Sequence, residues 1–150
     1  MTAKQYLNQI RELDSEINRM QRHYDLLTRD RTFLKSPCLG RDRVQTSPDG
    51  SGFTRISDKI VDMQMQINRK IDELVDKRDL IIRQINSLGR LYSDSDYVDI
   101  LFMRYVDYKK YKNFDMIADD VLLSYSRTVF KHGVALKLFY DHYLKNEKEA

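Results

Sequence analysis

Six large apolar residues recur at intervals of seven through the middle of this chain. They are Phe53, Ile60, Ile67, Leu74, Ile81 and Leu88. A seven-residue repeat places these side chains on one stripe of an α-helix and is typical of helices that pair along that stripe. The repeat predicts a helix over residues 53–90, roughly 50 Å long at 1.5 Å per residue, with Gly89 as its C-cap. A second set widens the stripe on one side: Ile56, Met63, Ile71, Ile82 and Ile85. Because such a helix cannot bury its stripe alone, it needs a partner.

The N-terminal part of the chain carries a second apolar repeat. Its members are spaced alternately four and three residues apart and are Tyr6, Ile10, Leu13, Ile17, Met20, Tyr24 and Leu27. This spacing predicts a helix over residues 3–34 with one narrow apolar stripe, and Thr2 can cap its first turn. Charged residues of both signs lie between the stripe positions, as expected for a solvated helix face.

Residues 36–52 separate the two helical patterns. They contain the helix-breaking residues Pro37, Gly40, Pro48, Gly50 and Gly52. Since the two helices are similar in length, an antiparallel pairing across this loop is the simplest way to bury both stripes. Pairing between two copies of the chain is the main competitor, and the two arrangements can coexist in a four-helix bundle. Arg41 and Arg43 could bring the loop to a phosphate or a protein partner; a plain connecting loop is the alternative.

The composition changes near residue 93. Eleven of the sixteen aromatic residues lie at or after Tyr97, which predicts a compact domain over residues 93–146 filled by aromatic side chains. Ser93 or Ser95 is expected to cap its first helix, which belongs to the stretch 93–112. The apolar face of that helix is assigned to Val98, Leu101, Phe102 and Tyr105.

Residues 113–136 have the pattern of two short helices with a tight break between them. Asn113 is the expected N-cap of the first helix and Ser124 that of the second. The residues expected to point inward are Met116, Ile117, Ala118 and Val121 in the first helix and Val129, Leu136, Phe139 and Tyr143 in the second, with Leu122 and Leu123 covering the turn. This is the layout of a helix-turn-helix, whose second helix enters the DNA major groove with its N-terminal residues against base edges.

The distribution of charge adds support for a nucleic-acid partner, although the net charge of +3 is too small to indicate one by itself. Basic residues gather at two places flanking the helix-turn-helix pattern. The first group is Arg104, Lys109, Lys110 and Lys112, with Asp107 among them, and the second is Arg127, Lys131 and Lys137, with no acidic residue between Ser124 and Tyr140. Both groups could contact DNA phosphates, and an ordinary solvated helix face is the alternative.

Several classes of function have no matching pattern in this sequence. Cys38 is the only cysteine, so no disulfide can form within the chain, which fits a reducing cytoplasm. The first residues lack the apolar core of a signal peptide, and no apolar run is long enough to span a membrane. His23, His132 and His142 share no metal-ligand spacing with Cys38 or with a carboxylate pair, and no glycine-rich phosphate loop or nucleophile elbow is present. We therefore expect no enzyme activity, no metal, no cofactor and no membrane partner.

Five short matches in the C-terminal unit resemble the last domain of bacterial sigma factors. They are Ile100-Leu101, Arg104-Tyr105, Ile117-Ala118, Ser124 as a cap, and Ala135-Leu136. Nearly the whole chain is similar to a narrower group, the small sigma-like proteins of phages and prophages of Gram-positive bacteria described as late-gene transcriptional activators. The stretches that carry this similarity are TAKQYLNQIRELDSEINR, SPCLGRDRVQTSPDG and KIVDMQMQINRKIDELVDKRDLIIRQI.

The resemblance implies that the second helix of the motif reads DNA. By position, Tyr125, Ser126 and Arg127 would lie at its N-terminal end, with Phe130 and Lys131 one turn later. Arg127 suits guanine or phosphate and Lys131 suits phosphate, and we add Lys109 and Lys110 as phosphate contacts. The chain departs from the sigma pattern in three ways. Met116 stands where an acidic residue is usual, Thr128 stands where an aliphatic core residue is common unless the register shifts to Val129, and Asp119 and Asp120 add negative charge.

These observations predict an all-α protein. Residues 1–90 would form a two-helix, antiparallel coiled-coil arm with its loop at 36–52, and residues 93–146 a small helix-turn-helix domain. The expected function is a sequence-specific, DNA-binding transcriptional regulator of a phage or prophage, acting in the cytoplasm of the bacterial host cell. Expected partners are double-stranded DNA, RNA polymerase and a second copy of the chain through the coiled coil. The alternative is a structural or adaptor phage protein, either a coiled-coil assembly factor or a small DNA-packaging subunit.

Overall fold

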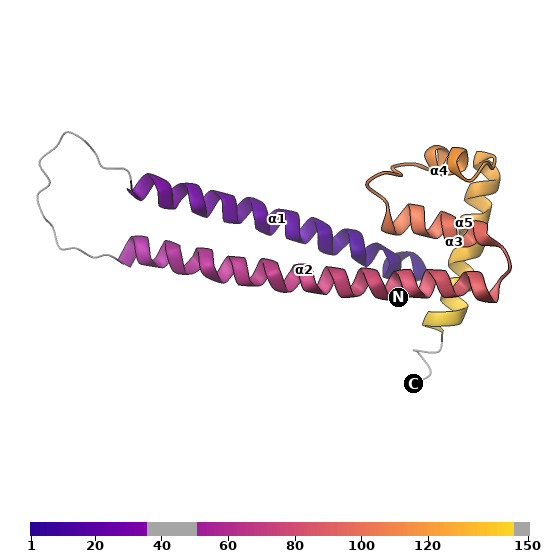
Figure 1. The fold of residues 1–150 in the computed structure, drawn as a ribbon, viewed down its shortest axis with the longest axis horizontal. Helices are drawn as coiled ribbons and strands as arrows, with labels where there is room; N and C mark the ends of the chain where they lie inside the picture. The colour runs from indigo at the N-terminus through magenta and orange to yellow at the C-terminus, as the bar shows by residue number, and fades with distance from the viewer. Residues whose placement is uncertain (36–50, 146–150) are drawn as a thin grey trace, which may run out of the picture. The chain divides into compact units, whose positions relative to one another are not determined.

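The computed structural model describes residues 1–35 and 51–145, and every regular element in these two ranges is helical (Figure 1). The all-α class is therefore confirmed for this part of the chain. The elements in order are α1 (Ala3–Lys35), α2 (Ser51–Leu91), α3 (Ser95–Leu101), the π-helical turn η1 (Phe102–Val106), α4 (Phe114–Asp120), α5 (Tyr125–Phe139) and a second π-helical turn, η2 (Tyr140–Leu144). The expected loop over 36–52 lies outside the described residues, Cys38, Arg41 and Arg43 included, except that Ser51 and Gly52 already belong to α2.

The contacts within the chain divide it into two units. Unit 1 comprises Met1–Asp14 and Leu74–Ala150, and unit 2 comprises Ser15–Glu73. The boundary expected near residues 90–93 falls inside unit 1, because the first turns of α1 and the last turns of α2 pack with the C-terminal helices. The ring of Tyr6, for example, lies 5.9 Å from that of Phe139, measured between centroids.

The seven-residue repeat of α2 is buried as its spacing predicts. Ile81 is fully buried, and Leu88 and Ile67 are each 2% exposed. Ile60 and Leu74 are each less than a tenth exposed. In the widening set, Ile85 is fully buried, whereas Ile71 is 41% exposed and does not belong to the buried stripe. The side chain of Phe53 lies outside the described residues.

Within each unit α1 contacts α2. In unit 1 the Tyr6 hydroxyl donates to Gln84 Oε1 over 3.1 Å, and Lys77 Nζ lies 4.5 Å from the centroid of the Tyr6 ring. In unit 2 Lys70 Nζ lies 3.4 Å from a carboxylate oxygen of Glu16. The stripe of α1 is buried at Tyr6 and Ile10 and half-buried at Leu13, Ile17, Met20, Tyr24 and Leu27. The contacts of Tyr6 with Gln84 and Lys77, and of Glu16 with Lys70, therefore join α1 and α2 within each unit.

Gly89 has a different role from the C-cap that we expected. The helix continues past it to Leu91, so Gly89 is an interior residue of α2. A Cβ atom at this position would lie only 2.8 Å from Cγ2 of Val98 in the neighbouring helix α3. The absence of a side chain therefore allows α2 and α3 to approach each other closely.

The substitution Gly89→Ala should destabilise unit 1 because the new methyl group would overlap the stiff, β-branched Val98. Gly133→Ala in α5 is the matched control, since a Cβ at Gly133 meets nothing within 4 Å. Both substitutions gain the same helix propensity, about 1 kcal/mol, so their difference isolates the overlap. We expect Gly89→Ala to be less stable than Gly133→Ala by about 1–3 kcal/mol, measured by urea unfolding. Equal stabilities would show that α2 and α3 do not pack closely here.

The helices of unit 1 enclose a core to which most elements contribute. α5 packs against both α3 and α4, and α4 packs against η1 (Figure 1). One cluster joins Ile100, Tyr111 and Ile117, with Met103, Phe114 and Val121 packed against it. The cap of α3 is Asp94, whose carboxylate accepts from the N–H of Asp96, rather than Ser93 or Ser95 as we expected.

The stretch 93–112 contains a π-helical turn after the short helix α3. At its end the N–H of Asp107 donates to the carbonyl of Phe102 over 3.0 Å. The carbonyl of Asp107 then accepts from the N–H groups of Lys110 and Tyr111, each over 3.1 Å. The backbone therefore makes a tight turn at Asp107, and the basic residues of this stretch lie on either side of that turn. Turns of the π-helical type are found frequently at functional sites.

Candidate nucleic-acid interface

Two side-chain caps begin the helices of the expected DNA-binding motif. Oδ1 of Asn113 accepts from the N–H of Met116 over 3.1 Å at the start of α4. Oγ of Ser124 accepts from the N–H of Arg127 over 3.3 Å at the start of α5. Each cap satisfies one of the N–H groups that a helix start leaves without a partner. Both predicted caps are confirmed.

The turn between α4 and α5 is short. The N–H of Leu123 donates to the carbonyl of Ala118 over 3.0 Å, which ends α4. Leu122 has a φ of 56°, in the left-handed region that glycine adopts most readily. Its side chain is 89% exposed, so the expectation that Leu122 covers the turn is wrong. The positive φ turns the chain sharply enough for Ser124 to cap α5 two residues later, and the side chain of Leu122 points outward.

The buried faces of α4 and α5 differ from the expected ones at two positions. Ile117, Ala118 and Phe139 are buried as predicted, but Met116 is 43% exposed. In α5, Val129, which we expected to point inward, is 38% exposed, and Thr128 is fully buried. The Thr128 hydroxyl donates to the carbonyl of Ser124 over 3.0 Å, so its polar atom is satisfied inside the core. This local bond is the reason that a threonine can replace an aliphatic residue there.

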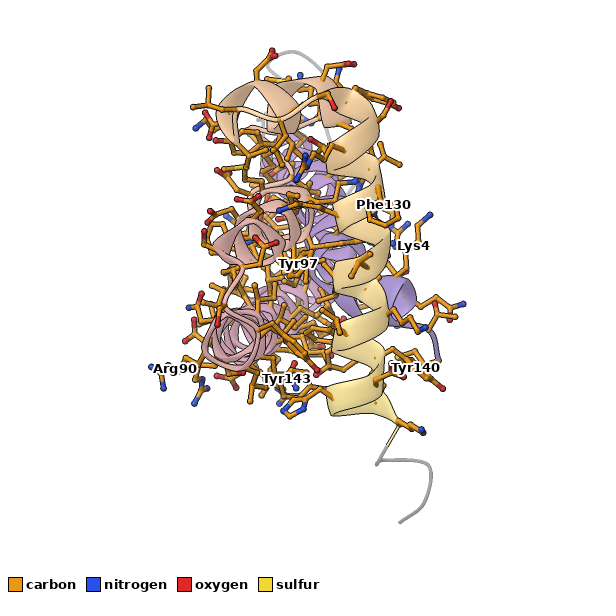
Figure 2. The ribbon with its side chains drawn as sticks, turned by 90° about the vertical axis from the view of Figure 1, so that its right-hand side faces the viewer. Lys4, Arg90, Tyr97, Phe130, Tyr140 and Tyr143 are labelled. Atoms are coloured by element: carbon orange, nitrogen blue, oxygen red, sulfur yellow. The ribbon has the colours of Figure 1, made fainter. Side chains whose placement is uncertain are left out.

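The outer side of α5 carries four of the residues expected to bind DNA. Tyr125 is 53% exposed and Phe130 is 71% exposed; Ser126 and Arg127 are exposed as well. Figure 2 looks onto this helix, with Phe130 extending from its outer side. All four lie in the N-terminal half of α5, where the opposite side of the helix is buried at Thr128. These four residues therefore present one cation, two hydroxyl groups and two aromatic rings to solvent.

Lys131 is placed differently from the other expected contacts. Its Nζ donates to Asp94 over 2.8 Å and to Asp96 over 2.5 Å, and its side chain is only 14% exposed. Hydrogen bonds to Asp94 and Asp96 raise the pKa of Lys131, and the Lys131 bond lowers the pKa of Asp94. A phosphate could use this ammonium only by displacing the two carboxylates of α3. Lys131 therefore joins α5 to α3.

Lys109 and Lys110 lie after η1, on a different segment from the outer side of α5. Lys109 Nζ donates to Asp14 over 3.0 Å, and its side chain stays 65% exposed. Lys110 Nζ donates to the Tyr111 hydroxyl over 2.8 Å, and that hydroxyl donates to Asp120 over 2.7 Å. Apart from Lys131, the expected site residues therefore form two groups: the outer side of α5, and the segment after η1.

No family model matches this chain, and no curated protein or solved structure matches it either. The resemblance to sigma-like proteins thus stays an expectation from the quoted motifs. In residues 1–35 and 51–145, no helix is both long and apolar enough to cross a membrane. The same part of the chain contains no cluster of three or more histidine, cysteine, aspartate or glutamate side chains placed to bind a metal.

His132, the most enclosed of the histidines, lies in an aromatic setting. Its Nε2 is 3.0 Å from the Tyr105 hydroxyl, and its ring meets the Phe114 ring edge-on with centroids 4.9 Å apart. Burial, with Arg104 and Lys4 nearby, lowers the pKa of His132 to about 4. Burial also raises the pKa of Tyr105 to about 12. The imidazole is therefore neutral at pH 7 and packs against the rings of Tyr105 and Phe114.

The basic group near η1 includes one residue that was not expected there from the sequence. Arg11 of α1 lines the same hollow as Arg104, Lys109 and Lys112, together with the rings of Tyr108 and Tyr111. The spacing of the basic residues from 104 to 112 was visible in the sequence. Nothing in the sequence pattern indicated that Arg11, at the other end of the chain, would join them.

Proposed function

We propose that α4, the turn and α5 are a helix-turn-helix and that the chain is a sequence-specific, DNA-binding transcriptional regulator of a phage or prophage. The observation that supports this most is the exposed N-terminal half of α5. Ser124 caps the start of this helix, and the helix packs against α4. A helix presented in this way fits the width of the major groove.

The residues on this side of α5 suit base edges. The guanidinium of Arg127 can donate two hydrogen bonds to guanine, Ser126 can bond to several bases, and the Phe130 ring can contact a thymine methyl group. Lys109 and Lys110 then serve as candidate phosphate contacts that fix the orientation on the duplex. Lys131 acts in this proposal through α3, by holding the reading helix in place.

The long helices have a place in the same proposal. We propose that α1 and α2 form a coiled-coil arm, which contacts RNA polymerase or joins two copies of the chain. Two copies would carry two reading helices, and a two-fold pair would favour a palindromic DNA site.

Arg127→Ala should weaken binding to the native DNA site by about 1–3 kcal/mol and relax specificity at one base pair. Arg90→Ala is the control, because Arg90 is exposed at the end of α2 and its substitution removes the same positive charge. The measurement is fluorescence anisotropy at several salt concentrations, with duplexes from the protein's genomic neighbourhood and scrambled duplexes of equal length. The control should behave as the unsubstituted protein.

The result for the two duplexes distinguishes the role of Arg127. An equal loss on native and scrambled DNA would mean that Arg127 contacts only the backbone. Unchanged binding to both would contradict the assignment of α5 as the reading helix. No binding by the unsubstituted protein at low salt would contradict the DNA-binding proposal itself.

The second candidate is a structural or adaptor phage protein that assembles through the long helices. Four apolar side chains of unit 2 favour it, because each is between 41% and 55% exposed: Leu26, Val61, Met65 and Ile71. Exposed apolar side chains on long helices are typical of protein contacts. Light scattering after size exclusion tests this candidate. A stable high-order ring would favour it, and a monomer or dimer that shifts a promoter fragment would oppose it.

A further inference from the structure

A cavity of about 430 Å³ opens in unit 1 beside the turn η1. Arg11 comes from α1 and Arg104 from η1, and the rest of the lining comes from the segment that follows η1. Those remaining residues are Tyr108, Lys109, Tyr111 and Lys112. A volume of this order is within the range of small-ligand sites, which begins near 300 Å³.

The backbone turn at Asp107 brings together residues that line this cavity. It reverses the chain after η1, so that Lys112 returns to the side of Arg104. A guanidinium nitrogen of Arg104 donates to the carbonyl of Lys112 over 3.3 Å, which holds the two residues together. The Arg104 guanidinium also lies 4.8 Å from the centroid of the Phe114 ring. One cation of the cavity is therefore fixed by a backbone contact and an aromatic ring.

The two tyrosines form a wall whose hydroxyl groups are already engaged. Tyr108 donates to Asp14 over 2.6 Å and Tyr111 donates to Asp120 over 2.7 Å. The Arg11 guanidinium carbon lies 5.7 Å from the centroid of the Tyr108 ring. Because both hydroxyl groups are engaged in these bonds, the polar groups of the cavity that a ligand can bind are mainly the basic side chains.

The charge of the lining is strongly positive. Among the described residues it contains four basic side chains and no acidic one. Asp14, just outside the lining, pairs with Lys109. Burial acts to raise the pKa of Asp14, but hydrogen bonds from Tyr108 and Lys109 outweigh it and keep this carboxyl group ionised. Asp120, which accepts from the Tyr111 hydroxyl, also lies just outside the lining, so two carboxylates border a lining that holds four basic side chains.

We propose that this cavity binds a phosphate group, held by the guanidinium groups of Arg11 and Arg104 and the ammonium groups of Lys109 and Lys112. A phosphate carries negative charge that suits a lining with four basic side chains, and its oxygens accept several hydrogen bonds at once. The phosphate comes from one of two sources, the DNA backbone or a free phosphorylated small molecule. The proposal does not depend on base reading by α5.

Inorganic tripolyphosphate is the probe for the site, titrated into the full chain by calorimetry at constant ionic strength. Lys112→Ala and Arg11→Ala should each weaken its binding by about tenfold or more, the loss typical when a hydrogen bond to a charged group is removed. Arg83→Ala and Arg90→Ala are the controls, since each removes one exposed cation of unit 1 that is outside the cavity. They should leave the affinity within about twofold, as screened distant charges do.

Two results would overturn the proposal. The first is the absence of tripolyphosphate binding to the unsubstituted chain. The second is an equal loss in the cavity variants and the controls, which would mean that the anion responds only to net charge. Because Lys112 is exposed, its replacement by alanine leaves the core intact, and a circular dichroism melt confirms that each variant is folded.

A competition experiment with duplex DNA distinguishes the two sources. If tripolyphosphate displaces the duplex and Lys112→Ala reduces the salt slope of DNA binding by about one, the DNA backbone supplies the phosphate. If both bind together, a free small molecule supplies it. If the chain binds no duplex but binds tripolyphosphate through Arg11 and Lys112, the proposed DNA-binding function fails and the phosphate site stands.

Discussion

Phe139→Ala is expected to lower the free energy of unfolding of unit 1 by about 3–5 kcal/mol. Phe139 is fully buried at the end of α5. Its ring lies 5.9 Å from that of Tyr6 and 5.0 Å from that of Tyr143, measured between centroids. The alanine would leave a cavity where α1 meets the C-terminal helices. Urea unfolding followed by circular dichroism measures the loss.

Phe130→Ala is the matched control for this substitution. Phe130 is on the same helix but is 71% exposed, so its removal should change the free energy of unfolding by less than about 0.5 kcal/mol. In the proposed function the same substitution weakens DNA binding, which makes it informative in both experiments. A small loss for Phe139→Ala, similar to that of Phe130→Ala, would contradict the grouping of the first turns of α1 with α5.

The elements of this fold could be predicted from the sequence where the signal is local. The repeat from Ile60 to Leu88 identified the buried side of α2, since one helix brings every seventh residue to the same side. Asn113 and Ser124 identified two helix starts, since each cap bonds to a backbone group three residues away. Periodicity and capping depend only on nearby residues, so they can be detected without knowledge of the tertiary structure.

The wrong predictions concern residues whose role depends on another element. Gly89 was assigned to a helix end, but it is explained by Val98 of α3. Met116 and Val129 were placed in the core by their apolar character, although α4 and α5 pack through neighbouring residues. Thr128 was assigned as a departure from the pattern, and its hydrogen bond to Ser124 makes it suitable for burial.

The candidate site shows the same difference between features that depend on nearby residues and features that depend on another element. The exposure of Tyr125, Ser126, Arg127 and Phe130 agrees with the positions expected from the motif. The pairing of Lys131 with Asp94 and Asp96 could not be predicted, because α3 and α5 meet only in the folded chain. Local charge counts can therefore suggest a basic surface but cannot show which cations are already paired.

Acid should destabilise unit 1 through His132 between pH 6.5 and 4. The ordinary pKa of histidine is 6.5, and that of His132 in the folded chain is about 4. In this interval the unfolded chain binds a proton that the folded chain does not, so stability falls as the pH falls. The contribution is present in full above pH 6.5 and is lost by about pH 4. With allowance for the partial exposure of the ring, we expect a loss of about 2–3 kcal/mol.

The physical cause is the setting of the imidazole. A neutral His132 can accept at Nε2 from the Tyr105 hydroxyl, whose raised pKa keeps it protonated. Protonation would place a positive charge in an aromatic setting and near two other cations, Arg104 and Lys4. Because burial is the largest cause of the shift, salt should reduce the effect only in part.

His132→Gln tests this explanation, because a glutamine cannot titrate and its side-chain oxygen can still accept from Tyr105. Urea unfolding of both proteins at several pH values between 7 and 4 gives two stability profiles, and their difference isolates His132. Asp94 is unchanged in the variant, and because its pKa lies below 3.8 its own contribution is lost mainly below this interval. We expect the profile of the variant to be flatter by about 2–3 kcal/mol. Parallel profiles would show that another group causes the acid sensitivity, and a steeper profile for the variant would contradict the neutral state of His132 in the folded chain.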